Sequence, residues 1–334
     1  MSVPYDAFLL VSFGGPEQPD DVLPFLKNVT AGKNIPEERL REVAEHYAPF
    51  DGKSPINEEN LALVRSLVGE FNAQGISLPV YWGNRHWHPF LVETLQQMAD
   101  EGIRHALAFV TSAFASYAGC RQYLEAIEDA RKQVGPEAPQ VDKLRLFFNH
   151  PGFIQAMAQR VKTAWQQVPE NRQQAARLVF SAHSLPVSMA RNCAYESQLH
   201  EACRLVAEEL GIERWDLAYQ SRSGPPSQPW LEPELGDHLV TLANSGEIGD
   251  VVLAPIGFMA EHMETVYDLD VEMAELCETL GLHLVRAGTV GNHPLFVTMI
   301  RQLVEERLTP GTPRLALGSL GPSHDVCPPD CCRP

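Results

Sequence analysis

The amino-acid sequence predicts an α/β protein with two similar doubly wound lobes, each a parallel sheet flanked by helices, and a cleft between the lobes. Apolar runs rich in β-branched residues alternate with amphipathic stretches of helical period along the 334 residues. The apolar runs are continuous, which is typical of parallel strands buried on both faces. This alternation occurs twice, on either side of a break at residues 135–150, where Pro and Gly cluster.

The positions of these two patterns give the elements in chain order. The predicted strands are Phe8–Phe13, Pro79–Gly83, His105–Thr111, Arg177–Ala182, Asp216–Gln220, Val251–Ile256 and His283–Ala287. The predicted helices are Pro19–Val29, Glu37–Tyr47, Glu58–Ala73, Pro89–Glu101, Arg121–Val134, Phe153–Val168, Met189–Leu210, Leu235–Ser245, Met259–Leu280 and Pro294–Leu308. The lobes then span residues 1–146 and 147–308, and residues 309–334 form a tail rich in Pro and Gly. The last helix either completes the second lobe or packs on the first.

The composition excludes several classes of function. The net charge of −17, from 43 acidic and 26 basic residues, argues against binding to nucleic acid or to anionic membranes. The chain has no apolar run long enough to span a membrane and no basic n-region at its start, so we expect a cytoplasmic protein. A P-loop, a GxGxxG spacing and a GxSxG elbow are all missing, which disfavours nucleotide cofactors and hydrolase triads.

The segment Pro255–Glu272 (PIGFMAEHMETVYDLDVE) carries the strongest chemical signal. Glu264, Asp268 and Glu272 are spaced by four, so on a helix they lie roughly along one face. Three carboxylates without a basic residue between them repel one another, and a metal ion against them would relieve the repulsion. On spacing alone, a solvated acidic helix face explains the pattern as well.

A second segment, SAHSLP at Ser181–Pro186, also follows an apolar strand. If both strands belong to one sheet, His183 and Glu264 emerge at the same edge of that sheet. An imidazole that faces carboxylates can accept a proton near neutral pH and can help to hold a divalent cation. A lone His after a strand is more often structural, but the two signals together favour a site. His262 points to another helix face than Glu264 and is expected to pack behind the site.

The stretch Tyr81–Phe90 (YWGNRHWHPF) follows a predicted strand and places Pro89 at the start of a helix, where its missing N–H is tolerated. His86 and Trp87 would line a cleft for a flat aromatic ligand. An ordinary strand–helix turn is the alternative, and it would be preferred for this stretch by itself.

Together these segments resemble ferrochelatases. The resemblance rests on SAHSLP, on PIGFMAEHMETVYDLD, on the SFGGP loop at Ser12–Pro16, on SPIN at Ser54–Asn57 and on YQSRSGPPSQPWLEP at Tyr219–Pro233, and it extends from Ala7 to Leu308. It implies a lyase of heme biosynthesis that inserts Fe²⁺, as substrate, into a porphyrin held between two Rossmann-like lobes, with release of two protons.

The resemblance also implies roles for single residues. His183 and Glu264 would be catalytic and would contact the metal, and Asp268 and Glu272 would form a hydrated relay for iron or protons. In this family the carboxylates lie on a π-type distortion of the helix, a feature frequent at functional sites.

The stretch Pro24–Tyr47 and the GKSPIN that follows at residues 52–57 look more like the coproporphyrin III type than the protoporphyrin IX type. Four propionates would then need cations and hydroxyls. The residues implied for the porphyrin are Phe13, Lys33, His46, Tyr47, Ser54, His86 and Tyr117. Phe13 stands where Gram-positive relatives often carry Tyr, so it has no oxygen to offer a metal and is expected to stack on the ring.

Other functions and partners are compatible with this resemblance. A protoporphyrin IX ferrochelatase and a related chelatase that inserts cobalt are alternatives of the same class, and a non-catalytic tetrapyrrole or metal carrier is one of another class. A transient iron donor or a downstream heme-pathway enzyme would be the protein partner.

Cys327, Cys331 and Cys332 in the tail are similar to the C-terminal cysteines that hold a [2Fe–2S] cluster in some ferrochelatases. The internal ligand of that family falls at Ala156 here, which cannot bind iron. The fourth ligand would therefore be Cys120, Cys193, Cys203, Cys277 or a residue other than cysteine. A zinc site and a tail of free thiols remain alternatives.

Overall fold

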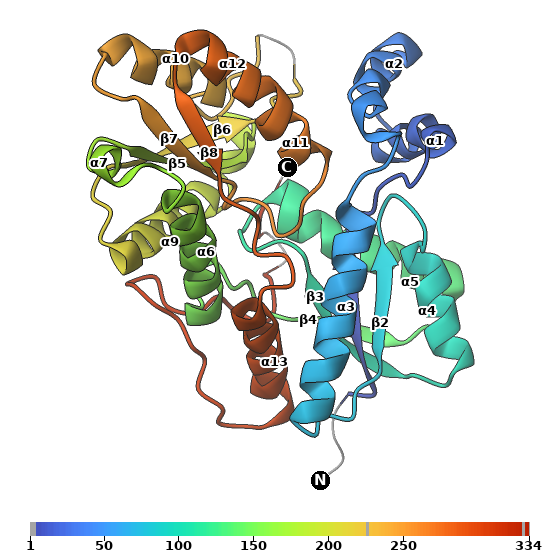
Figure 1. The fold of residues 1–334 in the computed structure, drawn as a ribbon. Coiled ribbons are helices and arrows are strands. Elements are labelled where there is room, and N and C mark those ends of the chain that lie inside the picture. Colours follow the sequence, from blue (N-terminus) through green and yellow to red (C-terminus); the bar gives the residue numbers. More distant parts are fainter. Residues whose placement is uncertain (1–4, 225–226, 329–330, 334) are drawn as a thin grey trace. The chain divides into compact units, whose positions relative to one another are not determined.

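The computed structural model describes residues 5–224, 227–328 and 331–333, and these form two four-stranded parallel sheets flanked by helices (Figure 1). The first sheet has the order β2-β1-β3-β4, and the second has the equivalent order β6-β5-β7-β8. The strands are β1 Ala7–Ser12, β2 Val80–Asn84, β3 His105–Val110, β4 Gln140–Lys143, β5 Arg177–His183, β6 Trp215–Gln220, β7 Asp250–Ala254 and β8 His283–Arg286. The predicted α/β class with two similar parallel sheets is confirmed.

The helices lie between the strands, as the pattern predicts. The α-helices are α1 Pro19–Val29, α2 Glu37–Glu45, α3 Ile56–Ala73, α4 Leu91–Asp100, α5 Gln122–Val134, α6 Pro151–Trp165, α7 Glu170–Gln173, α8 Val187–Ala190, α9 Tyr195–Leu210, α10 Leu235–Ser245, α11 Met263–Val266, α12 Met273–Leu280 and α13 Pro294–Leu308. A 3₁₀ turn, η1, covers Ala48–Phe50, and two π turns cover Tyr117–Arg121 (η2) and Asp268–Glu272 (η3).

Each sheet buries both of its faces. In the first sheet, Leu9 of β1 and Ala108 of β3 pack with Leu95 of α4, whereas Phe8 points to the other face and meets Phe71 of α3 with ring centroids 5.3 Å apart. In the second sheet, α10 and α12 cover one face and α6 and α9 the other (Figure 1). Burial on both faces explains why the central strands are continuous apolar runs.

Contacts divide the chain into two compact units that are discontinuous in sequence. The first comprises residues 1–111, 122–144 and 300–313, and the second comprises residues 112–121, 145–299 and 314–334. The second half of α13 thus belongs to the first unit, where Arg301 pairs with Glu70 at 2.8 Å. The lobe boundaries predicted from the sequence and the predicted cleft stay predictions. In the described part of the chain, no helix is both long and apolar enough to cross a membrane.

Several predicted elements differ from the structure. Strand β4 lies inside the stretch that was interpreted as a break. It was not predicted, because Gln-Val-Asp-Lys is a short, polar edge strand without an apolar run. The helix predicted at Met189–Leu210 is interrupted between α8 and α9, and the one predicted at Met259–Leu280 begins four residues later and contains η3. Pro89 lies before Phe90, the N-cap of α4, and so does not begin that helix.

Candidate functional site

His183 is the last residue of β5, the strand at which the order of the second sheet reverses. Its neighbour across the ladder is Gln220, the last residue of β6, so both side chains lie at the carboxyl edge of the sheet. The Oη of Tyr195 donates a hydrogen bond of 2.9 Å to the backbone carbonyl of His183. This edge, at a point where strand order reverses, is where open parallel sheets bind their ligands.

The loop after β7 brings Glu264 to His183. Gly257 lies against β5 so closely that a Cβ on it would come within 2.7 Å of Ala182 Cα, so only glycine fits there. His262 then caps α11, because its Nδ1 accepts from the backbone N–H of Glu264 at 3.1 Å. The Nε2 of His183 and the Oε1 of Glu264 lie 3.5 Å apart. His262 supports the segment from behind, as expected from its spacing.

The three carboxylates do not lie on a regular α-helix. The amide of Glu272 donates to the carbonyl of Tyr267, five residues earlier, at 3.1 Å, which is the hydrogen bond of a π turn. The π-type distortion implied by the resemblance is thus present at Asp268–Glu272. It leaves Asp268 half-buried and Glu272 exposed.

Asp268 is held by two residues that the sequence analysis did not single out. Ser221 Oγ donates to Asp268 Oδ2 at 2.6 Å, and Gln220 Nε2 reaches the same oxygen at 3.4 Å and the backbone carbonyl of Glu264 at 2.6 Å. Both lie in the YQSRSG part of a motif quoted for the resemblance, of which residues 225–226 are outside the described residues. That motif was the available signal.

His183 and Glu264 form an ion pair. Burial by itself lowers the pKa of His183, but the charge and hydrogen bond of Glu264 raise it to about 8. Burial opposes ionisation of Glu264 as well, yet the charge and hydrogen bond of His183 hold the pKa of Glu264 at about 2. Because the Nδ1 of His183 lies 2.5 Å from the Ser184 carbonyl, the Nε2 is the nitrogen that faces Glu264. The side chains remain 33% and 44% exposed, so solvent reaches the pair.

Asp268 titrates near neutrality. Burial raises the pKa of Asp268 to about 7, and the negative charges of Glu264 and Glu272 act in the same direction against the hydrogen bond from Ser221. The site therefore contains the Glu264 carboxylate, which is ion-paired with the His183 imidazolium. One turn later it contains the carboxyl group of Asp268, which exchanges protons close to neutral pH.

Arg286, at the end of β8, fixes the acidic segment from its outer side. Its guanidinium contacts both carboxylate oxygens of Asp270, one of them at 2.8 Å, and both oxygens of Glu261 at 3.0 and 3.1 Å. Glu261 precedes the cap of α11, and Asp270 lies inside η3. One arginine therefore ties together the two ends of the segment that carries Glu264 and Asp268.

In the first unit, the loop after β1 carries Phe13, which packs against His86 in a tilted arrangement with ring centroids 4.5 Å apart. The ring centroid of Phe25 lies 6.2, 6.2 and 6.4 Å from those of Phe13, Trp87 and Tyr47. Burial, helped by Arg85, lowers the pKa of His86 to about 3, so its ring is neutral at physiological pH. The structure thus groups three of the residues implied for the porphyrin, Phe13, Tyr47 and His86, in one aromatic cluster.

The other residues implied for the porphyrin are more dispersed. Lys33 is exposed, His46 caps the end of α2, and Ser54 is buried, with its amide bonded to the carbonyl of Pro16 at 2.9 Å. Tyr117 opens the π turn η2 of the second unit. Their contact with a porphyrin stays a prediction.

The tail docks on the second unit through hydrogen bonds to its backbone. Asn149 Nδ2 donates to the carbonyls of Leu317 and Gly321 at 3.0 and 2.9 Å, and Arg145 donates to that of Leu315 at 2.8 Å. Glu201 Oε1 accepts from the amide of Ser319 at 3.0 Å. The tail is therefore an ordered extension of this unit over its described residues.

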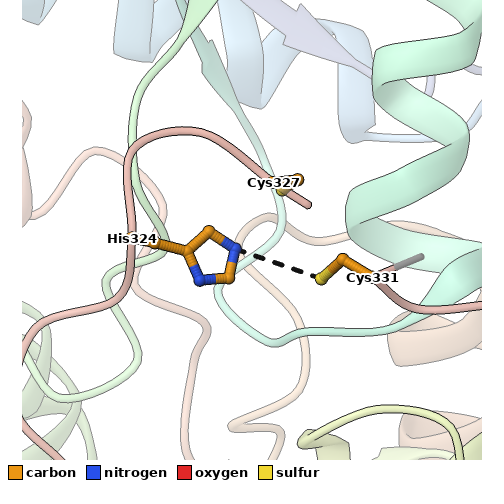
Figure 2. A group of neighbouring side chains, drawn as sticks. All are labelled: His324, Cys327 and Cys331. Carbon is orange, nitrogen blue, oxygen red and sulfur yellow. Dashed lines mark hydrogen bonds between the residues drawn. The ribbon is translucent and has the colours of Figure 1, made fainter. Parts of the chain in front are cut away.

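The cysteines of the tail meet cysteines from the body of the second unit. Cys332 is buried with Cys120, Ala115 and Leu146, and partly buried Cys193, Cys327 and Cys331 pack against this group. His324 Nε2, Cys327 Sγ and Cys331 Sγ all lie within 4.8 Å of one another (Figure 2). Thiols and an imidazole in such a group suit a thiophilic metal. Ala156, the position of the family's internal ligand, is a buried alanine of α6.

Comparison with known proteins shows the family that the chain resembles. The family model described as ferrochelatase matches residues 5–308. The chain is 55% identical over 329 residues to a protein of Rhodopirellula baltica named ferrochelatase, covering 98% of this chain and 93% of that one. It is 50% identical over 343 residues to a coproporphyrin III ferrochelatase of Frankia alni, covering 98% and 87%.

Among solved structures, the chain is similar to SirB of Bacillus subtilis with Fe³⁺, with a TM-score of 0.57, 13% sequence identity, and coverage of 91% of this chain and 95% of that one. At this identity the likeness concerns the fold. The family match and the sequence identities to relatives show that the chain belongs to the ferrochelatase family.

Proposed function

We propose that this ferrochelatase inserts Fe²⁺ into coproporphyrin III to give the iron complex and two protons. The observation that carries the chemistry is the His183–Glu264 pair at the edge of the second sheet, with Asp268 one turn away. A porphyrin must lose two pyrrole protons before its four nitrogens bind a divalent metal, so a base beside the ring is needed.

In this proposal, His183 and Glu264 contact the ring centre and the incoming Fe²⁺. His183 gives up its proton when a cation approaches, because a metal ion and a proton compete for Nε2, and Glu264 then offers a carboxylate oxygen. Asp268 and Glu272 pass iron or protons between this pair and solvent. A pKa of about 7 makes Asp268 able to take up and release protons under the same conditions.

The porphyrin preference is supported by the relatives. Several of them, among them those of Frankia alni and of Streptomyces griseus at 48% identity, are named coproporphyrin III ferrochelatase, whereas that of Rhodopirellula baltica is named ferrochelatase without a substrate. Coproporphyrin III has four propionates, which Lys33, His46, Tyr47, Ser54 and Tyr117 would meet. Phe13 and His86 would stack on the ring, since His86 is uncharged near neutral pH.

A direct comparison of substrates tests this preference. Initial rates of anaerobic Fe²⁺ insertion into coproporphyrin III and protoporphyrin IX would be compared, and the kcat/KM for coproporphyrin III is expected to be at least tenfold higher. A higher value for protoporphyrin IX would contradict the proposal. Lys33→Ala should reduce the preference by weakening one propionate contact, and Lys132→Ala, a change at an exposed lysine of α5, should not.

Variants of the central pair separate a chelatase from a carrier of the same fold. His183→Ala and Glu264→Gln should each lower insertion by about 10²-fold or more, the usual contribution of a positioned acid–base group. Porphyrin binding, followed by fluorescence quenching, should survive both changes. Near-normal turnover by either variant would exclude this mechanism.

We further propose that the thiols of the tail hold a [2Fe–2S] cluster, with Cys327, Cys331 and Cys332 among its ligands. The convergence of these cysteines supports a metal site of this class. Visible absorption and EPR spectra of protein purified without oxygen test it, and a colourless protein without iron and sulfide would contradict it. A cytoplasmic location and a transient iron donor or downstream heme-pathway enzyme also stay predictions.

A further inference from the structure

The metal site proposed for the tail has three cysteines, and the structure places an imidazole beside two of them, Cys327 and Cys331. The Nε2 of His324 points toward Cys331 Sγ at 4.0 Å (Figure 2). Cys331 Sγ also lies 3.5 Å from Cys332 Sγ. Two ligands on one tetrahedral ion, with bonds of about 2.3 Å to sulfur and 2.0 Å to nitrogen, lie about 3.5–3.8 Å apart. The observed separations are close to these edges.

We propose that His324 is the fourth ligand of the tail's metal site, so that the set is one imidazole and three thiolates: His324, Cys327, Cys331 and Cys332. This inference rests on the proposed cluster but concerns its ligands alone. All four donors come from the nine residues 324–332, so the site needs no ligand from the position of Ala156.

The internal cysteines fit a different role. Cys120, on η2, is buried among Ala115, Leu146 and Cys332 in the apolar group beneath the tail. Cys193 has its thiol bonded to the carbonyls of Met189 and Ala190 at 3.5 and 3.4 Å. Neither belongs to the compact group of donor atoms of His324, Cys327 and Cys331, whereas Cys332 lies beside that group, with its Sγ 3.5 Å from Cys331 Sγ. Cys120 and Cys193 therefore pack against the tail cysteines and support the metal site without binding the metal.

The segment that carries His324 is held in place by the rest of the tail. Arg314 donates to the backbone carbonyl of Ser323 and to Asp325 Oδ1, the latter at 3.3 Å. Ser323 and Asp325 are the two neighbours of His324, so Arg314 contacts the segment on both sides of this residue, while His324 itself is exposed. An anchored His beside thiols is arranged as a ligand for a metal that accepts both donor types, as zinc and iron do.

Pulsed EPR of the full-length protein tests the ligand set. The chain would be labelled with ¹⁵N-histidine, reconstituted without oxygen with iron and sulfide, and reduced. We expect about two irons and two sulfides per chain and a strongly coupled histidine nitrogen. His324→Cys should keep the iron and sulfide, lose the nitrogen coupling and shift the reduction potential to a more negative value, because thiolate replaces imidazole. His324→Ala should lose most of the metal.

Matched changes complete the test. His200→Ala, at an exposed histidine of α9, should leave the spectrum unchanged. Cys193→Ser and Cys120→Ser should retain the cluster. A cluster that shows no nitrogen coupling, survives His324→Ala and is lost in Cys193→Ser or Cys120→Ser would overturn the role of His324 while the cluster stands.

Two further outcomes concern the identity of the metal. A protein that binds neither iron and sulfide nor zinc would overturn the cluster and this inference together. A single zinc ion whose X-ray absorption shows three sulfurs and one nitrogen would overturn the cluster but support His324 as the fourth ligand.

Discussion

At the scale of single residues, the protonation state of His183 depends on one neighbour. Glu264 raises the pKa of His183 to about 8 against the effect of burial. In Glu264→Gln the burial remains and the charge is lost, so we expect the pKa of His183 to fall below its ordinary 6.5. The measurement is an NMR titration of the imidazole ¹³Cε1 signals in the metal-free protein. Glu278→Gln, at an exposed position of α12, is the control, and an unchanged pKa in Glu264→Gln would contradict the assignment.

The same pair makes stability depend on pH in a defined window. The pKa of His183 is raised on folding, so its contribution is present below pH 6.5 and is lost as the pH rises through about 8. The pKa of Glu264 is lowered, so its contribution is present above about pH 4.5 and is lost as the pH falls through about 2. The difference in urea midpoint between the native protein and Glu264→Gln should be largest between about pH 4.5 and 6.5. A difference that grew up to pH 9 would contradict this.

Some residues of the site were within reach of the sequence, and others were not. His183 and Glu264 were chosen because each follows an apolar strand, and the structure brings their side chains to 3.5 Å. Ser221 adopts a φ of +59°, which the sequence does not reveal for a serine, and this conformation belongs to the turn that directs its hydroxyl to Asp268. A hydrogen bond between residues 47 positions apart depends on the sheet edge, not on local pattern.

At the scale of elements, the loop after β7 depends on its glycine. Gly257→Ala would place a Cβ about 2.7 Å from Ala182 Cα, so β5 or the loop must move. We expect a loss of about 1–3 kcal/mol in unfolding free energy, as for other overpacked positions, together with reduced insertion because Glu264 moves with the loop. Gly249→Ala is the matched control, since nothing lies within 4 Å of its Cβ position. Denaturant unfolding and insertion assays measure both effects, and equal stability of the two variants would contradict the argument.

The π turn η3 is expected to depend on Arg286. Arg286→Gln leaves Glu261 and Asp270 without their cation, and because all three side chains are partly exposed we expect a cost of about 2 kcal/mol. Amide hydrogen exchange should accelerate over Asp268–Glu272, and insertion should fall more than porphyrin binding. Arg286→Lys keeps the charge but loses the two-pronged contact, so it should rescue only part of the effect. Unchanged exchange in Arg286→Gln would show that the turn is held by other contacts.

The elements themselves were predictable to different degrees. Leu235–Ser245 and Pro294–Leu308 have the predicted bounds, because their apolar period is regular and turn residues flank them. The interruption at residues 191–194 escaped prediction, and the π turn η3 was implied by the family resemblance but not by the apolar period, because the sequence at both places retains helical composition. At η3 the chain is bonded to another element, since Gln220 Nε2 donates to the carbonyl of Glu264 and to Asp268, and such bonds cannot be read from a local pattern.

At the scale of the molecule, the attachment of the tail to the second unit rests heavily on Asn149. Asn149→Ala removes two hydrogen bonds to tail carbonyls, a loss of about 2 kcal/mol and thus a roughly thirtyfold increase in the open population. Limited proteolysis should cut residues 314–328 correspondingly faster, as followed by mass spectrometry. Asn171→Ala, at an exposed residue of α7, is the control. Equal cutting rates in the two variants would show that other contacts hold the tail.

The sequence by itself determined the α/β class and the repeated order of strands and helices, because strands buried on both faces have continuous apolar sequences. It also determined the pair His183 and Glu264, because ligands bind where such strands end. Only the tertiary structure decided the edge strand β4, the hydrogen bonds from Gln220 and Ser221 that hold Asp268 on the π turn, the arginine that ties the acidic segment together and the imidazole beside the tail thiols. Each of these depends on contacts between residues far apart in the chain or on the exact path of a turn. Local composition does not encode such contacts, because they depend on how distant segments pack against and hydrogen-bond with one another.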